Sequence, residues 1–101
     1  MTEREINAAV ATKLGWERDP EFKSHLNKGR VRIHEKFLDF CHDIKAAWEI
    51  TEHPDIVWRL VQSPSGWWTA EGQKIGDGDC TKHEDKEAAM ALCGAFLKIL
   101  D

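Results

Sequence analysis

The stretch Ser63–Gln73, SPSGWWTAEGQ, places two adjacent tryptophans directly after a turn that contains proline and glycine. Side chains alternate along a strand, so a strand that begins here points Trp67 and Trp68 to opposite faces of its sheet. Tryptophan carries a large apolar ring, and we therefore expect both faces of the sheet to be covered. The cover could be a helix, a partner chain or a ligand.

The residues before the turn complete a hairpin. Residues 56–62 read IVWRLVQ, a run rich in β-branched and aromatic side chains. Both faces of this run are largely apolar, which is typical of a strand covered on both sides. Ser63–Gly66 then forms a four-residue hairpin loop, and we expect a third strand near residues 79–83, after the glycine-containing turn at 72–78.

Three segments have the spacing of apolar residues that is typical of amphipathic helices, namely 3–14, 44–52 and 86–100. A capping box at Thr2 and Glu5 begins the first helix, and Asp43 caps the second. The stripe that would face the core in the second helix is Ile44, Ala47, Trp48 and Thr51.

The polar segment 17–29 is expected to form a loop. Residues 30–36 alternate strictly, with Val31 and Ile33 on one face, which indicates a short strand or an extended arm. The other face holds the densest group of basic residues in the chain: Arg30, Arg32, His34 and Lys36.

This order of elements predicts a single α+β domain over residues 1–101. Its small antiparallel sheet, made of the hairpin and the third strand, would be covered by helices as an α-β-α sandwich. The chain has 101 residues, of which 42% are hydrophobic, so it can build a core without metals or disulfides.

The net charge of −4 argues against binding to duplex DNA, because such affinity depends on neutralising phosphates. The three cysteines have no repeating spacing, which argues against a disulfide framework. No apolar run resembles a signal peptide or a membrane span. We therefore expect a location in a reducing cytoplasm, with no membrane partner.

Two short pairs, Cys41–His42 and Cys80 with His83, contain the ligand types that zinc prefers. Neither pair has the spacing of a known zinc finger, so we expect no metal site and no cofactor. The chain also lacks the sequence motifs of serine hydrolases, zinc proteases and P-loop enzymes. We therefore do not expect an enzyme.

Cationic and aromatic residues are the candidates for ligand binding. Arg30 and Arg32 could grip a phosphate through their guanidinium forks, or could form the solvated face of an edge strand. Arg59 lies in an apolar strand and needs a carboxylate such as Glu71, a subunit contact or an anionic ligand. The indoles that could stack on a base or sugar, or build the core, are Trp58, Trp67 and Trp68.

The chain resembles the phage ABA sandwich family, small proteins encoded by phages and prophages. The matching segments are EINAAVATKLGW (Glu5–Trp16), DIKAAWEITE (Asp43–Glu52), the aromatic hairpin and DKEAAMALCGAFLKIL (Asp85–Leu100). The resemblance implies helix–sheet–helix layering and an origin in a phage or prophage, hence the cytoplasm of the host cell. It supplies no catalytic residue.

Two hypotheses of function follow. In the first, the protein is a non-catalytic accessory protein that binds a small anionic ligand as a homo-oligomer. Analogy with small phage proteins suggests a nucleotide immune signal of host anti-phage defence as that ligand. In the second, it is an interaction module that binds and inhibits a host protein through its acidic surface and exposed tryptophans.

Overall fold

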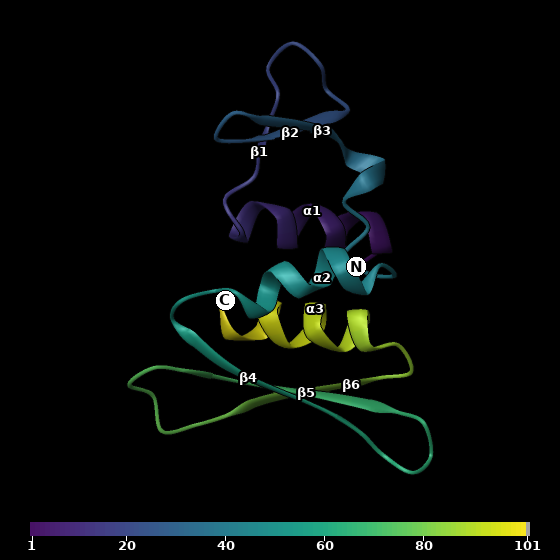
Figure 1. Cartoon of the computed structure of the whole chain (residues 1–101), viewed down its shortest axis with the longest axis vertical. Helices are drawn as coiled ribbons and strands as arrows, with labels where there is room; N and C mark the ends of the chain where they lie inside the picture. The colour runs from purple at the N-terminus through teal and green to yellow at the C-terminus, as the bar shows by residue number, and fades with distance from the viewer. Residues whose placement is uncertain (101) are drawn as a thin grey trace.

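Three helices lie between two small antiparallel sheets (Figure 1). The computed structural model describes residues 1–100. Its elements are α1 (Glu3–Lys13), β1 (Glu17–Arg18), β2 (His25–Lys28), β3 (Val31–His34), the 3-10 helix η1 (Glu35–Phe37), α2 (Ile44–Thr51), β4 (Ile56–Gln62), β5 (Trp68–Lys74), β6 (Thr81–Asp85) and α3 (Ala88–Ile99). The predicted α+β class, with a small antiparallel sheet covered by helices, is confirmed. Among residues 1–100, every helix is too short or too polar to span a lipid bilayer.

The predicted hairpin and third strand form the sheet β4-β5-β6. Gly66 has a φ of +93°, a conformation that glycine adopts without strain and that allows the tight turn between β4 and β5. The N–H of Ser63 donates to the carbonyl of Trp67 at 2.8 Å and closes this turn. Across the middle of the sheet, Arg59 lies opposite Glu71, and Glu71 lies opposite Lys82.

Helix α3 packs closely on one face of this sheet (Figure 1). Two glycines permit the close approach. A Cβ at Gly72 would overlap the side chains of Ile99 and Trp58, and a Cβ at Gly94 would overlap the imidazole of His83. Because glycine has no side chain, these two positions allow the short distance between the helix and the sheet.

The order of the layers differs from the predicted one, because all three helices lie on the same side of β4–β6 (Figure 1). Strands β4, β5 and β6 follow one another through turns, so no helix crosses to the far face. That outer face leaves Val57 63% and Val61 39% exposed. The expected cover on both sides of the paired indoles is therefore not present in the described chain: Trp68 is half-buried on the helix side, whereas Trp67 is 42% exposed.

The loop prediction for residues 17–29 is wrong, since β1 and β2 join β3 in a second sheet. A buried carboxylate organises this segment. Asp19 accepts hydrogen bonds from the backbone N–H groups of Glu21 (2.8 Å) and Phe22 (3.0 Å) and from the side chain of Asn27 (2.9 Å). These strands are short and polar, so they lack the alternation of apolar residues from which a strand is predicted. The strand predicted within residues 30–36 is confirmed as β3.

Helix α2 begins at its predicted cap, because the Asp43 side chain accepts from the N–H of Lys45 at 2.9 Å. The predicted apolar stripe of this helix is wrong in part. The helix buries Ala47 and Ile50, whereas Ile44 and Trp48 are 42% and 52% exposed. Contact with α3 favours the small alanine side of α2 over the side that carries the large indole.

Candidate functional site

The six predicted ligand-binding residues do not converge. Arg32 lies in β3 and Arg30 in the turn before it, at the opposite end of the molecule from β4–β6 (Figure 1). Within β4–β6, the cross-strand register separates the other four residues between the two faces. The helix side has Trp58 and Trp68, and the outer side has Arg59 and Trp67.

The side chain of Arg32 makes its contacts within the second sheet, β1–β3, and the adjoining loop. Its Nε lies 3.3 Å from Oδ2 of Asp19, and its guanidinium lies 5.1 Å from the ring centroid of Phe22. The pKa of Asp19 is lowered to about 2. The main causes are hydrogen bonds from the Phe22 backbone, the Asn27 side chain and the Glu21 backbone, and Arg32 has a smaller effect. Arg32 is thus engaged in holding the loop, while Arg30 is exposed in the turn between β2 and β3.

Arg59 is exposed on the outer face of β4 and makes no ion pair with any residue in the range 1–100. Its cross-strand neighbour Glu71 pairs instead with Nζ of Lys82 at 3.6 Å. Trp58 belongs to the core, where its ring centroid lies 6.4 Å from that of Phe96. Trp67, on the outer face, has Nζ of Lys86 5.6 Å from its ring centroid.

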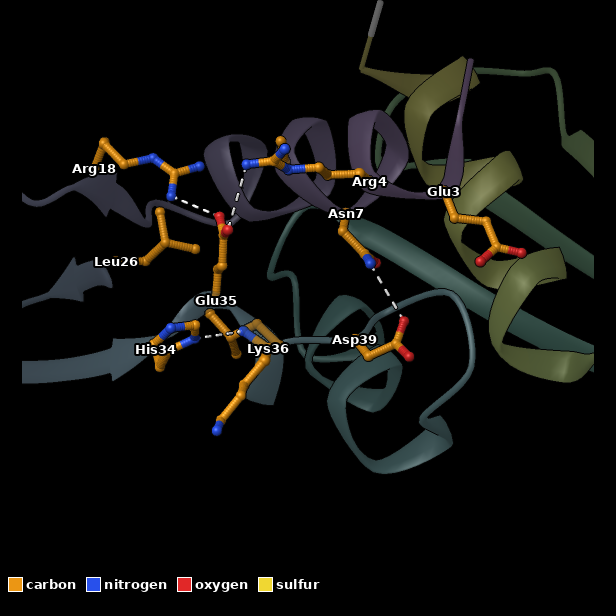
Figure 2. A pocket seen from close by; sticks show the side chains of 11 residues that line it. Glu3, Arg4, Asn7, Arg18, Leu26, His34, Glu35, Lys36 and Asp39 are labelled. Atoms are coloured by element: carbon orange, nitrogen blue, oxygen red, sulfur yellow. Dashed lines mark hydrogen bonds and ion pairs between the residues drawn. The ribbon is translucent and has the colours of Figure 1, made fainter. Parts of the chain in front are cut away.

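A pocket of about 370 Å³ opens elsewhere, between α1 and the segment that joins β3 to α2 (Figure 2). Two leucines, Leu26 and Leu38, are buried and supply its apolar surface. Its other lining residues are Glu3, Arg4, Asn7, Ala8, Arg18, His34, Glu35, Lys36 and Asp39.

Glu35 lies between two arginines at one side of this pocket (Figure 2). Nη1 of Arg18 donates to Oε2 of Glu35 at 2.7 Å, and Nη2 of Arg4 lies 3.5 Å from Oε1. The hydrogen bond from Arg18 is the main cause of the lowered pKa of Glu35. Arg18 also donates to the carbonyl of Lys23 at 2.8 Å, which orients its guanidinium. The pocket therefore holds a fixed carboxylate between two guanidinium groups.

The opposite side of the pocket has further polar groups. The amide of Asn7 donates to Oδ1 of Asp39 at 3.2 Å and accepts from the N–H of Cys41 at 3.0 Å. Nδ1 of His34 accepts from the N–H of Lys36 at 3.1 Å, so a neutral ring carries its proton on Nε2. These contacts fix η1 and the following loop against α1.

The two cysteine–histidine pairs lie apart. Cys41 is buried, and burial is the main cause that raises its pKa to about 11. His42 lies between two carboxylates, while Cys80 is exposed before β6 and His83 packs on α3. Within residues 1–100, no group of three or more histidine, cysteine, aspartate or glutamate side chains is placed to hold a metal ion.

Sequence reasoning identified His34 and Lys36 as part of a basic cluster, and both line the pocket. It missed Arg4, Arg18 and Glu35. Arg4 and Arg18 are 31 and 17 residues away from Glu35 in the chain, so no local pattern brings them together. The short strands β1 and β2, which position Arg18, were also not predicted.

The fold is similar to that in the crystal structure of a phage protein from Bacillus cereus ATCC 14579. The two structures align with a TM-score of 0.74 and 22% sequence identity, over 96% of this chain and 90% of the other. At this identity the likeness establishes a shared fold. No protein-family model and no curated protein matches the chain. The comparison supports the phage-protein fold that the sequence resemblance implied, without assigning the chain to the phage ABA sandwich family.

Proposed function

We propose that this protein is a non-catalytic accessory protein of a phage or prophage, that it acts in the cytoplasm of the host cell, and that it binds a small anionic ligand in the pocket between α1 and η1. The fold shared with the Bacillus cereus phage protein supports the proposed origin. The observation that supports ligand binding is the position of Glu35, whose carboxylate lies between Arg4 and Arg18.

The two arginines retain donors for a second anion. The side chains of Arg4 and Arg18 are 86% and 44% exposed, and a guanidinium has five N–H donors in all. A phosphate or carboxylate that enters the pocket can use the donors that Glu35 leaves free. Lys36, which also lines the pocket, adds a further positive charge.

The size and lining of the pocket favour a ligand with an apolar part. A volume of about 370 Å³ is within the range of small-molecule sites. The buried leucines would contact a base or a sugar while the guanidinium groups bind its phosphate. A nucleotide-type immune signal of host anti-phage defence has this chemistry, and its sequestration requires binding without turnover.

Calorimetry with a panel of cyclic dinucleotides, cyclic ADP-ribose isomers and inorganic phosphate tests this proposal. We expect at least one of them to bind, and the substitution Arg18→Ala to weaken that binding at least tenfold. Arg30→Ala is the matched control, because it removes the same charge from an exposed turn outside the pocket. Absence of binding by the whole panel, or equal losses in both variants, would contradict the proposal.

The second candidate function is binding to a host protein through α2. This helix exposes Trp48 and Ile44, which line a shallow hollow together with Lys45. A large exposed aromatic residue beside an aliphatic one is typical of protein interfaces. Specific capture of one host protein that is lost in Trp48→Ala and retained in Trp67→Ala would favour this alternative over the pocket.

A further inference from the structure

Strand β4 has an unpaired edge. It pairs with β5 on one side only, since the strand order is β4-β5-β6. The bonds from Ser63 N to Trp67 O and from Ile75 N to Asp55 O show that odd-numbered residues exchange hydrogen bonds with β5. The even-numbered residues of β4 therefore direct their N–H and C=O groups to the free side.

One of these outward groups already has a partner. The N–H of Ile56 donates to the carbonyl of His53 at 3.4 Å, which confirms its outward direction. Trp58, Leu60 and Gln62 follow on the same edge, and within residues 1–100 no backbone partner is found on that side. These three residues are symmetric about Leu60.

The opposite edge of the sheet is protected. Strand β6 is shorter, and the side chains of Lys82 and Glu84 are exposed on its outer face. Charged residues on an edge strand discourage pairing with another chain. Nζ of Lys98 also donates to the carbonyl of Lys82 at 3.4 Å. Strand β4 lacks such protection. Its seven residues include no proline and only one charged residue, and Val57 and Val61 are exposed on its outer face.

We infer that the free edge of β4 pairs with β4 of a second copy of this chain, antiparallel about a two-fold axis, to form a continuous six-stranded sheet. An antiparallel pair of identical strands matches each outward donor with an acceptor. The register that uses the three free residues places Leu60 opposite Leu60 and Trp58 opposite Gln62. Arg59 of each copy then lies beside Val61 of the other, which covers an exposed valine and keeps the two arginines apart.

The oligomeric state of the full chain is the first test. Sedimentation velocity at several hundred micromolar is expected to give a mass twice the 11.6 kDa of one chain. Val61→Lys places a lysine beside Arg59 of the other copy at two symmetric positions, so the dissociation constant should rise at least tenfold. Glu84→Gln is the control: it changes the net charge by the same one unit, in the same cross-strand row, at the protected edge. A monomeric wild type, or equal weakening in both variants, would overturn the inference.

Hydrogen exchange of individual amides distinguishes this edge from any other contact between copies. In the wild type, the amides of Trp58 and Leu60 should be protected at high concentration and exchange at least tenfold faster on dilution. The amide of Arg59, bonded to β5, should stay protected in both conditions and in Val61→Lys, which also reports that the variant is folded. A dimer in which the Trp58 and Leu60 amides exchange freely would refute the edge pairing.

Discussion

Nε2 of His42 lies 2.8 Å from Oε2 of Glu3, and this contact joins the loop before α2 to the first turn of α1. Nδ1 of the same ring lies 2.8 Å from Oε2 of Glu87, at the start of α3. The hydrogen bond with Glu3, followed by that with Glu87, raises the pKa of His42 to about 9. At neutral pH the imidazolium therefore donates to a carboxylate on each side and links three segments of the chain.

The free energy of unfolding should fall as the pH rises from about 6.5 to above 9. A histidine whose pKa is higher in the folded state stabilises that state fully below the pKa of the unfolded chain, about 6.5, and this contribution is lost as the pH passes through the folded value. Urea titrations at pH 6.5, 7.2 and 8 measure the slope, because above about pH 8.5 the buried thiols of Cys41 and Cys93, whose pKa values are raised, also lower the free energy of unfolding. His42→Gln should flatten it, and an unchanged slope in that variant would assign the pH dependence to another group.

Gly94→Ala should destabilise the protein by about 1–3 kcal/mol, because the new methyl group overlaps the imidazole of His83 in a close-packed interface. An alanine in a helix usually gains about 1 kcal/mol over glycine, so an exposed helical position would show the opposite sign. The measurement is the urea midpoint. Gly78→Ala serves as the control, since nothing lies within 4 Å of a Cβ at that position. A Gly94→Ala variant as stable as the wild type would contradict close packing between α3 and His83.

Glu35→Gln should strengthen the binding of anions to the pocket, by up to about tenfold for inorganic phosphate. The substitution removes the carboxylate that competes for Arg4 and Arg18, while a side chain of the same shape remains. Phosphate titration followed by NMR shifts of the arginine side chains provides the measurement. Glu84→Gln makes the same change of charge outside the pocket, so weaker binding in Glu35→Gln than in this control would exclude the proposed role of the arginines.

Cys80 should be the thiol that reacts rapidly with iodoacetamide in the native protein. It is exposed, whereas Cys41 and Cys93 are buried, and burial raises the pKa of both buried thiols. Because the thiolate is the reactive form, both buried groups should react slowly until the chain unfolds. Mass spectrometry of peptides after brief labelling, with and without urea, tests this expectation; early modification of Cys93 would mean that α3 opens readily.

The elements that could be predicted from the sequence are those whose signal is local. The capping box at Thr2, the cap at Asp43 and the turn at Gly66 each act within a few residues, and each lies where the pattern placed it. The strands β1 and β2 could not be predicted from apolar alternation, because their short polar sequences have none. The connection between them depends instead on hydrogen bonds that the side chain of Asp19 accepts from Glu21, Phe22 and Asn27.

The arrangement of these elements could be predicted less well, because it depends on contacts between distant segments. Periodicity shows that a helix has an apolar side but not which neighbour it meets, so Trp48 was assigned to the core. The same limit applies to the candidate site. The side chain of Glu35 joins arginines from α1 and β1, and no spacing along the chain relates these three positions.

The close contact of Trp58 and Ile99 with Gly72 restricts which residues these three positions can hold together. Trp58 and Ile99 together fill the space that a side chain at residue 72 would need. A descendant that gains a side chain there must lose volume at position 58 or 99 at nearly the same time. Among relatives that share this fold, we therefore expect these three positions to co-vary, with a bulky residue at 72 accompanied by smaller ones opposite it.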